Sequence, residues 1–375
     1  MFEKFKNYFF LILTLIIMFL GIERRLYISF FINETSGGDF ETHMRAVDEF
    51  IAGTNPYIWT VESYKNLESD PGNKGYAYLP GILYMNTFLF LIHLAVRFNL
   101  GFNIPLHIYI TMPGIIATTL IGWFFIKNFY KVNNLAMLFT TALWFFNPYF
   151  YLKDDIEGYD TIVICLLLWA FYYLEKDDVI SSFLFSLSVI FKTFPLITIF
   201  IFLLKAKDKK TFIITGILMF LLVSLPFFRS LDDFLIYIQG ALLVHGDRFI
   251  QGRPYLYYIS YYMKIEFFRI VPFKFYSISA IVSGWIASIG LYFIKFFKDK
   301  YVLSAIPFIT FYILTPVLNK TYIIWGIPFF LMSAYTLFSK KYRFMFYLLN
   351  IGYWVFEYWY LAQWRDGFHI WHPIL

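Results

Sequence analysis

Long apolar stretches alternate with short polar ones along most of the chain. The first, within "MFEKFKNYFFLILTLIIMFLGIERR", runs from about 8 to 22. Others follow at 79 to 96, 104 to 126, 135 to 150, 160 to 174, 180 to 204, 211 to 228, 275 to 294, 301 to 318, 321 to 338 and 343 to 361. A helix needs roughly 20 apolar residues to cross a bilayer. The pattern therefore predicts an all-α polytopic membrane protein with about eleven transmembrane helices, within a range of ten to thirteen.

The composition excludes the common soluble classes. Of 375 residues, 60% are hydrophobic, 24% aromatic and only 15% charged, whereas a soluble domain carries roughly 25% charged residues. The single cysteine, Cys165, rules out an internal disulfide. No metal-binding His or Cys motif and no phosphate-cradling glycine loop occurs, so we predict neither a metal nor another cofactor, and no nucleic-acid partner.

The distribution of basic residues predicts the orientation, since cytoplasmic loops of membrane proteins are enriched in Lys and Arg. If successive spans alternate, the short loops on the predicted outer side contain only Lys127, Lys131, Lys176 and Lys320. This assigns the amino terminus to the cytoplasm and predicts two long outer loops, 23 to 78 and 229 to 274, in a single membrane-embedded domain spanning 1 to 375. The stretch 254 to 270 is expected in the membrane interface. Alternation places 152 to 160 inside, so no catalytic role is assigned to Asp154, Asp155 or Asp160.

An amphipathic helix is predicted in the first outer loop, in "DFETHMRAVDEFIAG". Phe40, Met44, Val47 and Phe50 recur at helical spacing, which is typical of a helix lying on a membrane surface. Asp39 stands at its start, behind the flexible pair Gly37-Gly38. The simplest role for such an aspartate is an N-cap, because its carboxylate accepts the free amide hydrogens of the first turn.

Several stretches, in order along the chain, resemble the membrane-embedded GT-C glycosyltransferases, and most closely those that use polyprenyl-phosphate mannose. The matching stretches are Asp39 at the head of its helix, "GTNPY", "YAYLPGILY", "FFNPYFYLKDDIEGYD", "SLSVIFKTFPLITIF" and "NKTYIIWGIPFFLM". The chain departs from the family pattern at Tyr159, where a glutamine is usual, and in lacking an Asp-x-Asp after Asp39. That second departure argues against an obligatory divalent cation.

The resemblance implies a GT-C fold and a transferase reaction at the extracytoplasmic face of the cell membrane. A hexose, with mannose favoured, would pass from a polyprenyl-phosphate donor to a hydroxyl of a lipid-linked or glycan acceptor, with inversion. Asp39 would be the general base, since a positioned carboxylate that takes the hydroxyl proton contributes roughly 10²–10⁴-fold. The residues expected to bind acceptor or sugar are Glu41, His43, Tyr57, Tyr78 and Tyr322.

The donor phosphate needs cations, because the leaving group departs as an anion. The second outer loop offers His245, Arg248 and Arg253, and Lys320 lies at an outer loop. Each of these has an alternative role, the arginines as contacts to ordinary lipid phosphates and Lys320 as a snorkelling side chain.

Lys192 is a stronger candidate for the donor phosphate. It lies near the middle of the predicted span 180 to 204, and a charge at that depth usually faces a polar cavity. The alternative is a structural ion pair with Asp160 or Glu157.

Other functions remain open from the residues alone. An oligosaccharide ligase using a diphosphate-linked donor is the nearest enzyme class. A lipid or solute transporter would be expected to show internal repeats, and none is evident. A non-catalytic lipid-binding subunit would explain the hydrophobicity but not the grouping of Asp39, His43, Lys192 and Arg248.

Overall fold

The computed structural model describes residues 2–31, 38–65, 75–151, 158–244, 251–252, 254–255, 273–338 and 340–365. The α-helices are α1 (Phe2–Phe31), α2 (Gly38–Ile51), α3 (Tyr57–Lys65), α4 (Gly81–Leu100), α5 (Leu106–Phe129), α6 (Asn134–Phe145), α7 (Pro148–Tyr151), α8 (Tyr159–Tyr173), α9 (Asp178–Phe191), α10 (Ile199–Lys205), α11 (Lys209–Ser224), α12 (Leu231–Ala241), α15 (Phe273–Phe293), α16 (Lys300–Leu314), α17 (Ile327–Leu337) and α18 (Arg343–Arg365). Short 3₁₀ helices are η1 (Phe194–Thr198), η2 (Leu225–Phe227), η4 (Lys320–Gly326) and η5 (Lys340–Tyr342). Two-residue strands β1 (Gln251–Gly252) and β2 (Val317–Leu318) pair in parallel.

The structure confirms an all-α chain of the membrane type. Among the described residues, four helices are long and apolar enough to cross a membrane, within 4–31, 81–100, 106–129 and 209–227, and several other apolar helices are shorter. Their outer faces carry large apolar side chains, such as Phe19 at 66% exposure and Leu218 at 60%. Such surfaces suit lipid rather than water. The number of spans stays a prediction.

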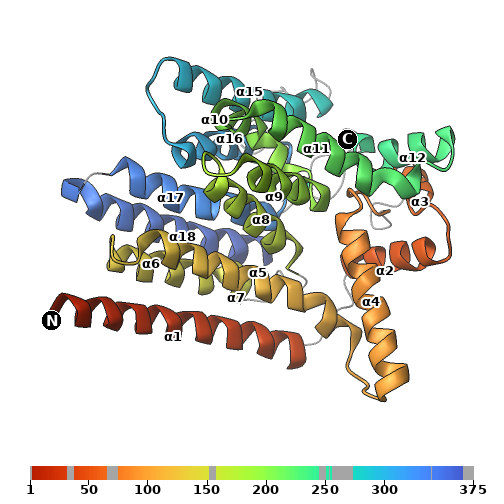
Figure 1. The fold of residues 1–375 in the computed structure, drawn as a ribbon, viewed down its shortest axis with the longest axis horizontal. Coiled ribbons are helices and arrows are strands. Elements are labelled where there is room, and N and C mark those ends of the chain that lie inside the picture. Colours follow the sequence, from red (N-terminus) through yellow and green to blue (C-terminus); the bar gives the residue numbers. More distant parts are fainter. Residues whose placement is uncertain are drawn as a thin grey trace.

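Helices α1 and α5 run antiparallel and define two ends of the bundle (Figure 1). Where α1 finishes, the Ser29 hydroxyl lies 2.6 Å from that of Thr111, near the start of α5. Halfway along, Met18 packs against Gly122, where an added Cβ would lie 2.8 Å from the Met18 methyl carbon. We call the end where α1 begins the amino end and the end where it finishes the loop end.

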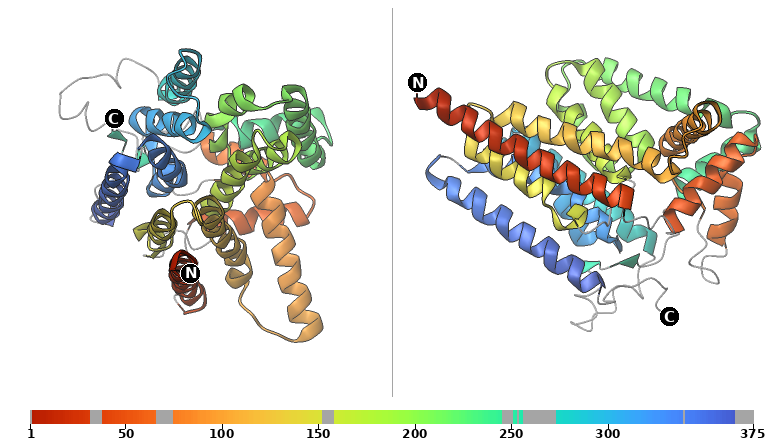
Figure 2. Two further views of the ribbon diagram at one scale, coloured as in Figure 1. Left: turned by 60° about the vertical axis from the view of Figure 1, so that its left-hand side comes forward. Right: turned by 90° about the horizontal axis from the view of Figure 1, so that it is seen from below.

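The loop end gathers the predicted outer loops. Arg229, ahead of α12, donates a 2.6 Å hydrogen bond to the Gly53 carbonyl after α2. The Asn55 amide donates to Asp233 of α12 at 3.3 Å. Figure 2 shows α2 and α3 together at this end, remote from the start of α1. The described parts of segments 23 to 78 and 229 to 274 therefore meet.

The amino end is held by polar contacts between helix termini. Asn134, at the start of α6, donates to Asn7 of α1. Lys205, at the end of α10, pairs with Glu175 after α8 at 3.2 Å, and Lys300 at the start of α16 donates to the Leu174 carbonyl at 2.8 Å. These contacts fix which helix ends lie together.

The strict alternation expected from the sequence is wrong in the middle of the chain. Tyr159 packs against His43 of α2, 4.8 Å between ring centroids, so the start of α8 lies at the loop end with the first outer loop. Lys127, at the end of α5, lies over Tyr172 near the end of α8, so this lysine lies at the amino end, as do the turns holding Lys131 and Lys176.

Helix α4 explains the error. It begins beside the end of α9, where an added Cβ on Gly81 would lie 2.8 Å from the Ile190 carbonyl, and α5 then begins beside Ser29. Both points are at the loop end, and α4 crosses the bundle axis instead of following it (Figures 1 and 2). Hydropathy reports how long an apolar helix is, but not its direction.

Cysteine labelling tests this arrangement, because Cys165 is buried at 5% exposure and gives little background. Lys131→Cys and Lys176→Cys should react with an impermeant thiol reagent from one side of the membrane, and Asp48→Cys and Leu231→Cys from the other. The control is Cys165→Ser. If Lys131→Cys reacts from the same side as Asp48→Cys, the arrangement above is incorrect.

Candidate functional site

A buried ion pair lies at the loop end, where several helices finish. The Lys192 ammonium is 2.7 Å from Asp160 Oδ1, and the indole N–H of Trp325 donates to the same oxygen at 2.9 Å. The Asp160 side chain is 3% exposed and that of Lys192 is 15%. The carboxylate is therefore enclosed, and the Lys192 side chain keeps a small exposed surface.

Asp160 is positioned by a glycine contact. It lies in the first turn of α8, where the positive end of the helix dipole stabilises a carboxylate. Gly158 before it has φ +67°, and an added Cβ there would lie 2.6 Å from the Gly114 Cα in α5. Only glycine at 158 allows this backbone and this approach, so the "GYD" sequence fixes where Asp160 points its carboxylate.

Lys192 lies at a break between two helices, and the expectation that it sits in the middle of one span is wrong. Pro195 cannot continue α9, because its ring would clash with the carbonyl of Phe191. Helix α9 ends at Phe191, Lys192 is extended at φ −151° and ψ 143°, and η1 follows. Since α10 ends beside Glu175, the predicted span 180 to 204 is a hairpin of two shorter helical segments. The alternative of an ion pair with Asp160 is confirmed, whereas Glu157 lies outside the described residues.

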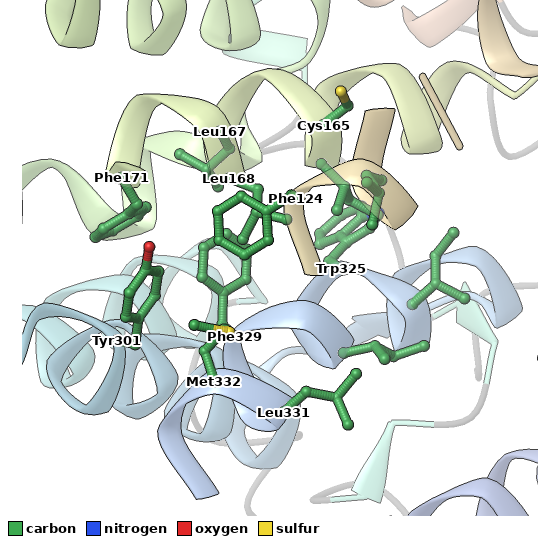
Figure 3. Packing of buried hydrophobic residues seen from close by; sticks show 14 of the residues in the cluster. Phe124, Cys165, Leu167, Leu168, Phe171, Tyr301, Trp325, Phe329, Leu331 and Met332 are labelled. Atoms are coloured by element: carbon green, nitrogen blue, oxygen red, sulfur yellow. The ribbon is translucent and has the colours of Figure 1, made fainter. Parts of the chain in front are cut away.

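Aromatic rings enclose the pair on two sides. Trp325 is stacked between Phe194, at 4.1 Å and 5° between planes, and Tyr322, at 4.0 Å and 27°. The Lys192 ammonium lies 5.4 Å from the ring centre of Tyr78. Figure 3 shows Trp325 among the buried side chains of the main core. Trp325 is 5% exposed and both faces of its ring are covered, so the rings beside the pair that keep exposed surface are those of Tyr78 and Tyr322.

His43 connects α2 to this group. It is 3% exposed, stacks on Tyr78 at 5.5 Å and packs on Tyr76 and Tyr159 at 5.4 and 4.8 Å. The Asn86 amide of α4 donates to the Tyr159 hydroxyl at 2.9 Å. The structure thus brings together His43, Tyr78, Lys192 and Tyr322, four residues selected from the sequence.

Asp39 lies one turn before His43 on α2, and positions i and i+4 share one side of a helix. Its backbone is therefore on the side of α2 that faces the ion pair. The predicted amphipathic helix is confirmed, but its apolar side packs against protein, with Val47 at 1% exposure, instead of lying bare on the membrane. Glu41 is exposed and stands at a different angle around the helix, so the structure does not bring it to His43.

Tyr57 supports the site from behind. It is fully buried, and its hydroxyl donates to the Tyr78 carbonyl at 2.7 Å. A side chain with no exposed surface cannot touch a ligand without rearrangement. Its contact instead holds the backbone of Tyr78, so the predicted binding role becomes a positioning role.

The predicted phosphate ligands are only partly within the described chain. Lys320 opens η4, the same short helix that carries Tyr322 and Trp325, and β1 pairs with the segment entering it. Gly252 of β1 has φ +75° and would place a Cβ 2.1 Å from the Leu318 carbonyl, so this pairing needs glycine. His245, Arg248 and Arg253 lie outside the described residues, and their roles stay predictions.

The site is recessed from the ends of the long helices. Gly114, which contacts Gly158, lies eight residues into α5. At about 1.5 Å per residue, that is ~12 Å from the tip of α5. Asp160 and Lys192 therefore lie below the level at which α1 finishes and α5 begins.

The two Asn-Pro-Tyr sequences noted in the resemblance form the same pattern of hydrogen bonds. Asn55 Oδ1 accepts from the Tyr57 amide at 3.1 Å, and Asn147 Oδ1 accepts from the Tyr149 amide at 2.9 Å. Each asparagine also donates its amide to a distant acid, Asp233 or the buried Glu357, the latter at 2.6 Å. These motifs fasten separate segments together and leave chemistry to other residues.

Sequence reasoning missed Asp160, Trp325, Phe194 and Asn86 as site residues. Asp160 stood in a recognised motif and was set aside only because alternation placed it on the wrong side. Asn86 could not be identified from the sequence, because a single amide side chain in an apolar helix does not indicate which group it hydrogen-bonds.

Within the described ranges, no three His, Cys, Asp or Glu side chains gather as a metal site would require. No protein-family model matches the chain, and no characterised protein matches it by sequence.

The buried pair can be tested by a double-mutant cycle. Lys192→Met should lower the free energy of unfolding by about 3 kcal/mol, because it leaves the Asp160 charge enclosed without its cation. Asp160→Asn together with Lys192→Met should restore most of that loss in thermal unfolding of detergent-purified protein. Lys205→Met is the matched control, costing at most about 1 kcal/mol, since its partner Glu175 is 42% exposed. Equal losses in the Lys192 and Lys205 variants, or additive effects in the double variant, would contradict a coupled buried pair.

Proposed function

We propose that this protein is a membrane glycosyltransferase of the GT-C type, which moves a hexose from a polyprenyl-phosphate donor to an acceptor hydroxyl. The observation that carries the proposal is the recessed Lys192–Asp160 pair, lined by Trp325 and Tyr322 and faced by the side of α2 that holds Asp39. A cation, the partly exposed rings of Tyr78 and Tyr322, and a carboxylate-bearing helix suit a lipid-phosphate sugar. The resemblance of the motifs in order supports the same conclusion.

In the proposed reaction, the acceptor oxygen attacks the anomeric carbon as the bond from that carbon to the phosphate oxygen breaks. The electron pair of the broken bond leaves with polyprenyl phosphate, and Asp39 takes the hydroxyl proton. Attack from the face opposite the phosphate gives inversion. Lys192 stabilises the charge that develops on the leaving phosphate, and Asp160 holds the ammonium in place.

The pair Lys192–Asp160 is neutral as a unit, so further cations are needed to bind a phosphate tightly. Lys320, on the helix that carries Tyr322, and Arg253, which follows Gly252 of β1, are the proposed sources. His245 and Arg248 belong to the same connection in sequence. Mannose is the sugar favoured by the resemblance.

We place the loop end outside the membrane and the amino end in the cytoplasm. Three lysines that the sequence analysis assigned to outer loops, Lys127, Lys131 and Lys176, lie at the amino end with the clusters near 205 to 210 and 295 to 300. This concentrates basic residues on one side, as cytoplasmic loops require. An outer-face site and about eleven spans are consistent with this arrangement.

Two other functions are distinguished by their substrates. A ligase would use a diphosphate-linked glycan, which needs more positive charge than one neutral ion pair supplies. A transporter would move its ligand without breaking a bond.

The deciding experiment incubates purified protein separately with polyprenyl-phosphate mannose, glucose and arabinose, and with a polyprenyl-diphosphate oligosaccharide, using extracted membrane lipids as acceptors. We expect transfer from a monophosphate-linked hexose. Transfer from the diphosphate donor alone would establish the ligase, and transfer from none would remove the proposal.

The base is tested by Asp39→Asn, which keeps a helix-capping side chain but removes the proton acceptor. The rate of transfer should fall by about 10²-fold or more while donor binding is retained. Asp48→Asn, on the exposed side of the same helix, is the matched control and should leave the rate close to wild type. Near-normal turnover by Asp39→Asn would falsify the assignment.

A further inference from the structure

Two lysines at the amino end share one aromatic ring. Lys127, in the last turn of α5, places its ammonium 4.6 Å from the ring centre of Tyr172 and 5.4 Å from that of Trp169. Lys176, in the turn after α8, lies 3.3 Å from the same Tyr172 ring. The two ammonium groups are therefore no more than about 8 Å apart, at a separation where like charges repel.

Neither ammonium is paired with a carboxylate among the residues that the structure describes. The nearest acid in sequence, Glu175, has its carboxylate turned to Lys205 at 3.2 Å and Lys300 at 3.9 Å. Asp177 caps the start of α9 by accepting from the Ile180 amide at 3.0 Å. Glu175 and Asp177 are therefore engaged elsewhere, and the two ammonium groups share the Tyr172 ring without a carboxylate contact in the described chain.

An apolar stripe on α5 leads to this pair of lysines. Ile116, Leu120 and Trp123 are 59%, 43% and 51% exposed, and they precede Lys127 at intervals of four, three and four residues. Those intervals place them on one side of the helix. From Ile116 to Lys127 the stripe is ~16 Å long at 1.5 Å per residue, close to half the thickness of a bilayer's hydrocarbon core.

We propose that Lys127, Lys176 and Tyr172 form a binding site for one anionic glycerophospholipid of the inner leaflet. The lipid phosphate lies between the two ammonium groups and accepts a hydrogen bond from the Tyr172 hydroxyl. One acyl chain follows Ile116, Leu120 and Trp123. A zwitterionic headgroup would bring a third positive charge to the site, so the site selects an anionic lipid over phosphatidylcholine.

The site is separate from the proposed donor site, which lies at the other end of the bundle. It joins the end of α5 to the end of α8, and the same two helices meet at Gly114 and Gly158 near the ion pair. A lipid bound there stabilises the packing of α5 on α8. The inference does not depend on the glycosyltransferase activity, but it rests on the proposed orientation, in which the amino end lies at the cytoplasmic face of the membrane.

The test uses the full-length protein, purified in a neutral detergent and delipidated, with phosphatidylglycerol or phosphatidylcholine added. Native mass spectrometry measures the retained lipid, and thermal unfolding measures the stabilisation. Wild type should bind phosphatidylglycerol at least about tenfold more tightly than phosphatidylcholine, since each lysine near an anionic headgroup contributes roughly fivefold.

Lys127→Gln with Lys176→Gln should abolish that preference and the thermal stabilisation by phosphatidylglycerol. The matched control is Lys209→Gln with Lys210→Gln, which removes two exposed charges from the same end of the bundle and should keep both. Equal binding of the two lipids to wild type would overturn the proposal. The same loss in both double variants would overturn it too, because it would show attraction to a basic surface and not a site.

Discussion

A buried charge must be compensated locally, and the Lys192–Asp160 pair imposes that constraint on the whole loop end. Asp160 sits at the positive end of α8, and Lys192 follows the negative end of α9, so each helix dipole stabilises the charge beside it. The indole N–H of Trp325 supplies a further donor to the carboxylate. Lys192 and Trp325, from two segments far from Asp160 in sequence, thus contact the same Asp160 oxygen atom. Each of the three segments is therefore needed to form the site.

Glycine and proline residues around the pair allow those segments to meet. Gly158 permits the close contact of α8 with α5, and Pro195 ends α9 so that Lys192 leaves the helix at the site. Gly252 allows β1 to meet the segment leading into η4. Tyr312 then holds η4, its hydroxyl donating to the Tyr322 carbonyl at 2.7 Å and accepting from the Gly326 amide at 2.9 Å. The helix that carries Tyr322 and Trp325 is thus held in place by hydrogen bonds to its backbone.

Much of the fold could be predicted from the sequence, because apolar length and helical periodicity are local properties. The helical class, the amphipathic helix at Gly38–Ile51 and the location of the two long loops at one end of the bundle were predicted in this way, whereas their contact was not. The direction of each helix could not be predicted, since a helix that lies across the bundle, such as α4, has the same composition as one that runs along it. That one error moved Asp160 to the wrong end and removed it from the candidate site.

The site residues divide in the same way, into those that the sequence reveals and those that depend on tertiary packing. His43, Tyr78 and Tyr322 were identified from the family resemblance and Lys192 from a charge inside an apolar stretch, and the structure brings the four together. Tyr57 has the same signal, but its hydroxyl is used by the Tyr78 carbonyl. Whether a hydroxyl faces a ligand or a backbone carbonyl depends on tertiary packing, which one sequence does not contain.

The central claim is that the Lys192–Asp160 pair binds the phosphate of a lipid-linked sugar. The most direct measurement is equilibrium binding of radiolabelled polyprenyl-phosphate mannose to wild type and to the variant carrying both Asp160→Asn and Lys192→Met, after thermal unfolding has shown that the variant is folded. The account predicts that the folded variant loses at least about tenfold in affinity, as expected when a charge-assisted contact to phosphate is removed. Unchanged affinity in the folded variant would contradict it.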